Sequence, residues 1–474
     1  MTTTSPSSPP SSTPPMSLIP RMTMGERFGH ATAGFGQNLV YNWLNLFLLA
    51  FLYEGLKLSS RGIATLTVVL TVVRIWDAVN DIAIGLLVDR TRTRWGTFRP
   101  YPLITALPIA ILTTLLFAIP KPADPSGETR SIILVAIAYL LWDLVYTASD
   151  VPYWSLTAVM TSDEDERAKT VSWARIGATI ALALTVLFGP TLTKEVGWTA
   201  SAAIVAFVGM ALFTLAFFAT KERVQHRPDP VPLREALGIL GRNRPLQWLL
   251  LSMVIGFGTF VFQVGGAVLA TVVFGDIANF TTLGAALIVG TLIGTIATPA
   301  LLRRVTAKRT LIVTNLVATV VYLVLWFIGA RSVIQVAIGL AVAGVTMGIT
   351  SVVTTRMVGD TADETEVRTG ERTDGASFAG QTFTAKLNSA IATMAFGWAV
   401  AASGYEATAT VTDGMKAGIW AACTIIPAIS ALLSVLPLLR YAVDEPTLST
   451  RLAAVRAAKA ASPEEGPAGA DHAR

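Results

Sequence analysis

Charged side chains interrupt one of the apolar segments of this chain. Arg74, Asp77 and Asp81 fall within residues 62–88, a run long enough to cross a bilayer as a helix. Steps of three and four residues place the three side chains on one helical face, where they face protein or a water-filled path instead of lipid. Ionisable groups at membrane depth are costly and usually mark the route of an ion or a substrate. This segment therefore indicates a transport pathway.

The same face carries ligands that a hard cation prefers. Asp77, Asn80 and Asp81 supply oxygen atoms within little more than one helical turn, and Thr147 adds a hydroxyl from another segment. Oxygen ligands suit Na⁺ or Li⁺, whereas transition metals favour His or Cys. The three His and the single Cys423 form no metal-binding cluster. The sequence predicts a site for a coupling cation, Na⁺, Li⁺ or H⁺, and no other metal site.

A second set of polar residues lies in residues 131–159. Tyr146, Thr147, Asp150 and Trp154 are separated by steps of three and four and share one helical face. A carboxylate accepts hydrogen bonds from sugar hydroxyls, and an indole ring packs on the apolar face of a sugar. The pattern therefore predicts carbohydrate binding. For any single residue of the set, a polar network that only ties helices together is the alternative.

Two isolated cations lie in other apolar segments. Arg175 and Lys386 each need an anionic partner at membrane depth. We therefore expect a charge-balanced cavity, although for Lys386 a structural salt bridge between two halves of the protein is the alternative. The acids available inside apolar segments are Asp77, Asp81, Asp143 and Asp150.

The composition is that of a protein that crosses the membrane many times. Of 474 residues, 53% are hydrophobic and 14% are charged, and the mean hydropathy is +0.58. Soluble domains carry roughly 25% charged residues, so the sequence predicts a polytopic protein surrounded by the lipid bilayer. The net charge of +5 does not indicate nucleic acid, because most of the 36 Lys and Arg lie in the tails and loops of one side. That bias follows the positive-inside rule and places both termini in the cytoplasm.

Apolar segments divide the chain into two halves. Six lie in residues 25–220 and six in residues 246–441, separated by a polar cytoplasmic linker at 221–245. Residues 1–24 are expected to be a disordered tail, and residues 442–474 a cytoplasmic tail with a short surface helix. The expected spans are 28–53, 62–88, 100–119, 131–159, 169–190, 198–220, 246–274, 281–302, 310–329, 332–357, 376–403 and 411–441. Twelve transmembrane helices in two six-helix halves predict an all-α membrane protein with the major facilitator fold.

Four motifs make the chain resemble the glycoside-pentoside-hexuronide:cation symporters, the family that contains melibiose permease. They are Arg74–Asp81, Asp89–Pro100, Tyr146–Ser155 and, in the second half, the segment from Asp360 to Lys386. Their order and spacing fit the family, and the resemblance extends from about Glu26 to Tyr441. It implies the major facilitator fold and alternating access.

The resemblance also implies roles for individual residues. The cation site would consist of Asp77, Asn80, Asp81 and Thr147. The sugar site and the charges around it would consist of Asp150, Trp154, Tyr146, Arg175 and Lys386, with Thr382 lining the cavity one turn before Lys386. Family members commonly place an aspartate just after a glycine in the first span, whereas this chain has Gly36, Gln37 and Asn38. The amides of Gln37 and Asn38 are therefore expected to replace that acid in substrate binding.

The resulting hypothesis is a functional monomer in the plasma membrane, the inner membrane of the cell, that couples Na⁺ or H⁺ to the symport of a glycoside, oligosaccharide or related sugar. The coupling cation is the only cofactor expected, with no organic group. A carrier of the same fold for an amphiphilic, lipid-like substrate is the alternative, favoured by the missing first-span acid. An enzyme or sensor ranks low, because the only dense acidic run, Asp163–Glu166, resembles a solvated connector and neither tail resembles a folded domain.

Overall fold

The computed structural model describes residues 22–122, 125–161, 163–223, 238, 241–369, 374–405 and 411–461. Within these ranges the protein is helical apart from turns and an isolated bridge between Thr93 and Gly96. The first half contains α1 (Met24–Ala50) with its continuation η2 (Phe51–Gly55), α2 (Ser60–Arg90), α3 (Pro100–Leu116), α4 (Pro125–Met160), α5 (Glu164–Phe213) and α6 (Leu215–Ala219). Residues 1–21 of the predicted N-terminal tail and most of the predicted linker lie outside the described residues, whereas Met22 and Thr23 are described and Met24 begins α1.

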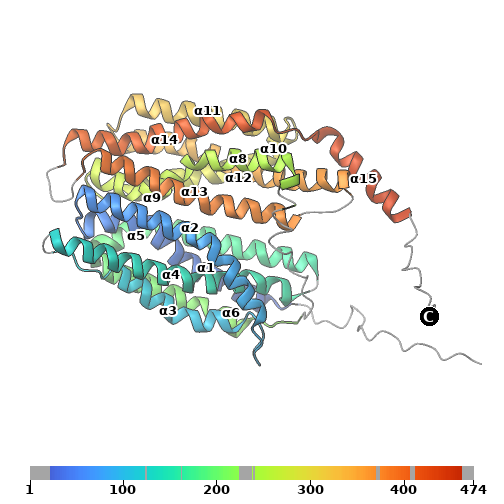
Figure 1. Cartoon of the computed structure of the whole chain (residues 1–474), viewed down its shortest axis with the longest axis horizontal. Helices are drawn as coiled ribbons and strands as arrows, with labels where there is room; N and C mark the ends of the chain where they lie inside the picture. Colours follow the sequence, from blue (N-terminus) through green and yellow to red (C-terminus); the bar gives the residue numbers. More distant parts are fainter. Residues whose placement is uncertain are drawn as a thin grey trace, which may run out of the picture.

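The second half begins with a long helical rod made of α8 (Arg244–Ile255), η3 (Gly256–Phe260), α9 (Val261–Val268) and η4 (Leu269–Val273). The helices that follow are α10 (Asn279–Leu302), α11 (Ala307–Ile328), α12 (Val333–Thr369), α13 (Asp374–Ala402), α14 (Asp413–Leu439) and α15 (Glu445–Ala461). Figure 1 shows the helices of the first half bundled on one side and those of the second half on the other. The halves meet where α1 contacts α9, α2 contacts α13 and α5 contacts α10.

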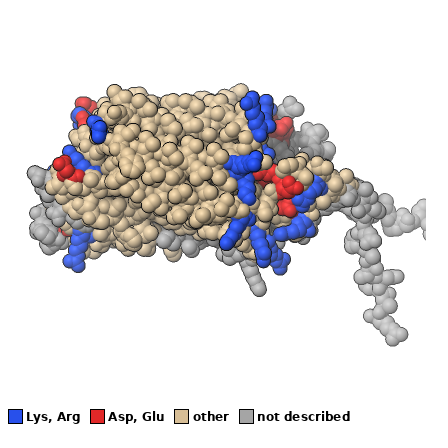
Figure 2. All heavy atoms as spheres, turned by 90° about the horizontal axis from the view of Figure 1, so that it is seen from above, with Lys and Arg blue, Asp and Glu red and all other residues tan. Residues whose placement is uncertain are grey.

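The surface has the distribution of polar groups that a bilayer requires. Seven helical segments in the described chain are long and apolar enough to cross a membrane, and Pro100–Leu116 and Arg61–Val73 are shorter apolar helices. Large apolar side chains point outward, among them Phe327 at 79% and Ile296 at 77% exposure. Figure 2 shows a broad band of uncharged surface between two ends that carry the charged residues. The chain is a multi-pass membrane protein.

Two glutamates hold equivalent loops in the two halves. The carboxylate of Glu222, just after α6, accepts hydrogen bonds from the backbone amides of residues 97–99 at 2.7–2.9 Å. The carboxylate of Glu445, just after α14, accepts from the amides of Ala307 and Lys308 at 2.7 and 3.0 Å. Both acids satisfy donors at a helix N-terminus that have no partner inside the helix. The same device is therefore repeated in both halves, which the sequence motifs alone do not reveal.

The boundary between the expected spans at 169–190 and 198–220 differs from the prediction. The structure continues α5 without a loop through residues 191–196, and only Gly197 departs from helical geometry, with φ of 81°. A positive φ is accessible to glycine because it has no Cβ. A single glycine therefore replaces the short loop that the sequence predicts between these spans.

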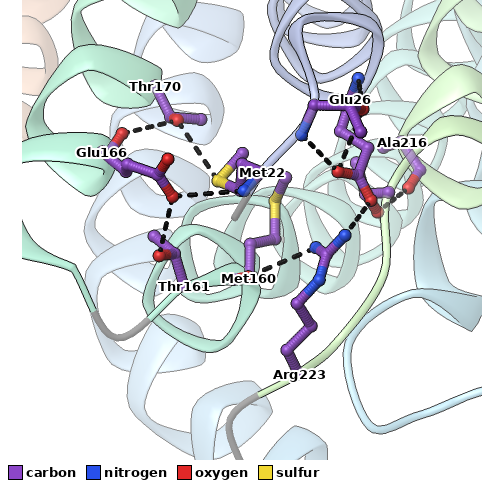
Figure 3. A network of polar contacts seen from close by, with 10 residues as sticks. Met22, Glu26, Met160, Thr161, Glu166, Thr170, Ala216 and Arg223 are labelled. Carbon is purple, nitrogen blue, oxygen red and sulfur yellow. Dashed lines mark hydrogen bonds and ion pairs between the residues drawn. The ribbon is translucent and has the colours of Figure 1, made fainter. Parts of the chain in front are cut away.

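The ends of the first half are tied together by a polar network, shown in Figure 3. Glu166 accepts hydrogen bonds from the amide of Met22 at 3.2 Å and from the hydroxyl of Thr161 at 3.1 Å. Arg223 donates to Glu26 at 2.6 Å. Burial by itself would raise the pKa of Glu26, but the bonds from Thr23 and Arg223 outweigh it and hold that pKa below its usual value. Glu166 is thus an anchor for the segment before α1, although the sequence predicts only a solvated connector there.

We call this end of the helices, which holds the segments before α1 and after α6 and α14, the terminal end. The opposite end, with the turns after η2 and η4 and the break at Gly197, is the far end.

Candidate substrate and cation site

The first cavity lies among α1, α4, α5 and α13 and has a volume of about 180 Å³. It therefore draws on both halves, since α13 belongs to the second. The residues predicted from the sequence that line it are Asn38, Tyr146, Thr147, Asp150, Trp154, Arg175 and Lys386. Asp143, one of the expected intramembrane acids, lines it as well. The structure thus gathers most of the predicted substrate residues around one space.

Asp150, Trp154 and Arg175 form a connected group in the wall of this cavity. The indole Nε1 of Trp154 donates a hydrogen bond to the Asp150 carboxylate at 3.2 Å, one helical turn away on α4. The guanidinium of Arg175, from α5, lies over the Trp154 ring at 4.6 Å from its centre, a cation–π contact. These two contacts fix the plane of the indole beside a carboxylate. An oriented aromatic face next to a hydrogen-bond acceptor suits a sugar ring.

Aromatic rings extend the same wall along α4. Trp142 and Tyr146 stack with centres 4.7 Å apart, and Tyr41 of α1 stacks on Tyr146 at 5.3 Å. The indole of Trp142 is held by a 2.9 Å hydrogen bond to Thr113. The cavity is also lined by Tyr41, Tyr139 and Trp142, none of which is among the site residues predicted from the sequence. Extending the helical spacing of Tyr146 and Asp150 backward to residues 142 and 139 would have found the two on α4.

The two amides of the first span have different surroundings. Asn38 lines the cavity and donates to the carbonyl of Gly34 at 2.8 Å. Gln37 is fully buried and donates to the hydroxyl of Ser149 at 3.2 Å, so it packs α1 against α4 and is not among the residues lining the cavity. Adjacent positions on a helix point about 100° apart. Of the two amides, only Asn38 lines the cavity, and its part in substrate binding stays a prediction.

The predicted cation site is described only in part. Thr147 lines the cavity and is 2% exposed, and Asn80 is 3% exposed with an Nδ2 atom that has no partner in the described chain. The side chains of Asp77 and Asp81, and of Arg74, lie outside the described residues. No cluster of three or more His, Cys, Asp or Glu that could hold a metal occurs among the residues that were described. The cation site therefore stays a prediction.

The two residues predicted on α13, Lys386 and Thr382, have different positions, and Ser389 was not predicted from the sequence. Lys386 and Ser389, one turn apart, line the first cavity. Thr382 is exposed, donates to the carbonyl of Phe378 at 3.2 Å and does not line this cavity. Lys386 therefore brings a cation from the second half to the acids of the first.

A second cavity, of about 360 Å³, lies inside the second half. Its lining includes the amides of Gln263, Asn315, Gln381 and Asn388, together with serine and threonine hydroxyls from α12 and α14. None of the described residues that line it is charged. The sequence does not predict this cavity, because neutral polar residues in an apolar helix are common and carry no strong signal.

The sequence family described as MFS/sugar transport protein matches residues 29–445. The chain belongs to this family. One similar protein is the inner membrane symporter YicJ of Escherichia coli strain K12. Its sequence is 31% identical to this chain over 435 residues, which cover 89% of this chain and 92% of YicJ. The isoprimeverose transporter of Lactiplantibacillus pentosus is 29% identical, covering 93% of this chain and 92% of the transporter. The resemblance to glycoside and cation symporters is confirmed.

The fold agrees with this family. A crystal structure of a bacterial homolog of the human lysosomal transporter Spinster superposes with a TM-score of 0.65 at 14% identity, covering 92% of this chain and 98% of that one. At such low identity the similarity shows the fold alone. This member of the MFS/sugar transport family is therefore an all-helical transporter of the sugar type and not an enzyme.

Proposed function

We propose that the protein is a cation-coupled symporter of a glycoside or oligosaccharide that works by alternating access. The observation that carries the proposal is the first cavity, where Asp150, the oriented ring of Trp154 and Arg175 meet Lys386 from the other half. A carboxylate and an indole face suit sugar hydroxyls and the apolar face of a ring. We further propose twelve membrane spans with both termini in the cytoplasm.

The placement of Lys386 ties substrate binding to the movement of the halves. A sugar that contacts Asp150 in the first half and Lys386 in the second binds best when the halves are at one particular separation. A ligand that prefers one arrangement shifts the population toward it. The cation is expected to bind Asp77 and Asp81 with Thr147, and neutralising those acids strengthens sugar binding in the adjoining cavity. Such coupling is reciprocal, so the sugar also strengthens cation binding.

Contacts at the far end support alternating access. Lys194 and Asp276 form an ion pair of 2.8 Å between the halves, and Tyr405 donates a hydrogen bond to Glu54 at 2.9 Å. The rings of Phe47 and Phe280 meet edge to face, 5.8 Å apart. These contacts hold the halves together at the far end, and in our proposal they break whenever the cavity opens to that side.

The test is uptake into proteoliposomes of a panel of radiolabelled glycosides under imposed Na⁺, Li⁺ or H⁺ gradients. We expect one gradient to drive accumulation of at least one glycoside. Asp77→Cys and Asp81→Cys should each abolish the response to that gradient while leaving part of the sugar binding. Asp165→Asn, at an exposed acid near the start of α5, is the control and should transport normally.

Two results would contradict the proposal. Full ion coupling in both the Asp77 and Asp81 variants would contradict the assignment of the cation site to these two acids. Binding of a lysolipid but of no glycoside by the purified protein would instead favour the amphiphile carrier.

A further inference from the structure

Four side chains at the terminal end form a stack of cationic and aromatic groups. The guanidinium of Arg94, in the loop between α2 and α3, lies 4.7 Å from the centre of the Trp95 ring. Trp95 meets Phe217 of α6 edge to face at 5.8 Å, and Arg99 lies over the Phe217 ring at 5.2 Å. Arg99 also donates a hydrogen bond to the carbonyl of Phe217 at 2.7 Å. The stack therefore holds the loop against α6.

The cations beside this stack have no acidic partner in the described part of the chain. Arg92, Arg94 and Lys221 are exposed, and none of them forms an ion pair or a side-chain hydrogen bond there. The neighbouring carboxylate of Glu222 is already engaged, because it accepts hydrogen bonds from three backbone amides of the same loop. Three positive charges are therefore available to an anion that is not part of the described chain.

The stack lies where the apolar outer surface ends. Phe218 meets Phe217 edge to face at 5.1 Å and is 66% exposed, and the exposed side chains of Ile104 and Leu107 continue this surface along α3. Trp95 is 43% exposed, and its indole N–H has no hydrogen-bond partner among the described residues. Tryptophan favours the membrane interface because its ring contacts acyl chains while its N–H contacts polar headgroups. Trp95 is placed for both contacts.

The equivalent loop of the second half has the charge without the stack. Residues 303–309 include the exposed Arg303, Arg304 and Arg309 but no aromatic residue. An excess of Lys and Arg in both loops follows from the positive-inside rule alone. The contact between Arg94 and Trp95 goes beyond that rule, because it orients a guanidinium at the border of the apolar surface. The first half therefore has an ordered site where the second half has only positive charge.

We propose that this stack binds the headgroup of an anionic phospholipid. The phosphate accepts hydrogen bonds from Arg92 and Arg94, Lys221 adds a third positive charge, and the acyl chains lie over Trp95 and Phe218. A zwitterionic lipid binds less well, because its own cationic group cancels the charge that these residues attract. The lipid is a bound partner and not the transported solute, so this inference does not rest on the proposed function.

The test measures which lipid contacts Trp95. Full-length protein is reconstituted in phosphatidylcholine vesicles that contain brominated phosphatidylglycerol or, for comparison, brominated phosphatidylcholine. Bromine quenches tryptophan fluorescence at contact, and subtracting the signal of Trp95→Phe isolates Trp95 from the other tryptophans. We expect the wild type to prefer phosphatidylglycerol at this position by at least about fivefold, since one basic side chain near an anionic headgroup contributes roughly that factor. In Arg92→Gln/Arg94→Gln the preference should fall to within about twofold of none.

The matched control is Arg303→Gln/Arg304→Gln, which removes the same two charges from the equivalent loop. It should leave the preference at Trp95 within about twofold of the wild type. All four arginines are exposed, so both double variants should fold, which thermal unfolding checks. Equal quenching of Trp95 by the two lipids in the wild type would overturn the site. An equal loss of preference in both double variants would also overturn it, because it would show attraction to net charge alone.

Discussion

The two halves of the protein share an architecture but line their cavities with different chemistry. Around the first cavity, α4 presents Asp143, Asp150 and aromatic rings, and Arg175 comes from α5. In the corresponding part of the second half, α12 presents threonines and a serine, and α13 presents amides. The capping acids Glu222 and Glu445 show that the frame itself is repeated. Repetition of the fold therefore does not require repetition of the site.

The difference has an energetic reason. A buried charge pays a large desolvation penalty and must be matched by partners, so the first cavity collects acids and cations together. Neutral amides and hydroxyls pay much less and need only hydrogen bonds. Losing one charged group should therefore weaken binding more than losing one amide in the second half.

The largest effect is expected from Asp150→Asn. A hydrogen bond to a charged group contributes about 1.5–3 kcal/mol, so glycoside binding should weaken roughly 10- to 150-fold. The measurement is the dissociation constant of a transported glycoside, with Asn315→Leu in the second cavity as the comparison. A weaker effect at Asp150 than at Asn315 would reverse the comparison between the halves.

A smaller loss of glycoside affinity is expected from Trp154→Leu. This substitution removes both the aromatic face and the cation–π partner of Arg175. Aromatic and cation–π contacts contribute about 1–2 kcal/mol together, which corresponds to about 5- to 30-fold in affinity. Trp154→Phe keeps a ring but loses the hydrogen bond to Asp150, so it should fall between the wild type and the leucine variant in the same binding assay. Equal glycoside affinity in all three proteins would contradict a role of Trp154 in substrate binding.

Carboxylates at the terminal end of the two halves should respond to pH in opposite ways. Burial raises the pKa of Asp360 to about 6, against the opposing charge of Arg356 and with help from Glu445 and Asp363. Its native pKa lies above the unfolded value of 3.8, so the native state binds the extra proton and stability increases as pH falls through 6 toward 4. After a discount for partial solvent exposure, the gain between pH 7.5 and 5 is about 1 kcal/mol.

The measurement is thermal unfolding of the wild type and of Asp360→Asn at pH 7.5 and pH 5. The asparagine variant should lose this gain. Glu26 has a lowered pKa, so its contribution is present above the unfolded value of 4.5 and is lost only as pH falls below it. Glu26→Gln should therefore keep the gain between pH 7.5 and 5, and loss of the gain there would contradict the assignment to Asp360.

The smallest effect is expected where the halves touch each other. Lys194 and Asp276 are exposed, and solvent screens such pairs strongly. Asp276→Asn should change the rate of uptake less than about fivefold, and the change should vanish at high salt. A large effect that persists at high salt would instead indicate that this ion pair is a main contact holding the two halves together at the far end.

The helical organisation of the chain is predictable from short-range patterns. Apolar runs of bilayer length and the positions of loops follow from hydropathy, and the helical spacing of residues 146, 150 and 154 places them on one face of α4. The break at Gly197 is harder to predict as a single residue, because its sharpness depends on a backbone conformation and not on composition. The family resemblance could likewise be stated from the motifs alone.

What the sequence determined by itself is which segments are helical and which faces carry polar groups, since both depend on periodicity and on the cost of placing charge in lipid. Which of those faces meet depends on the packing of the folded protein. This packing separated Gln37, which packs against Ser149, from Asn38, which lines the cavity, and it assembled amides from several helices into the second cavity. The physical reason is that helix packing sets the rotation of each helix about its axis, and residues distant in sequence become neighbours only once those rotations are fixed.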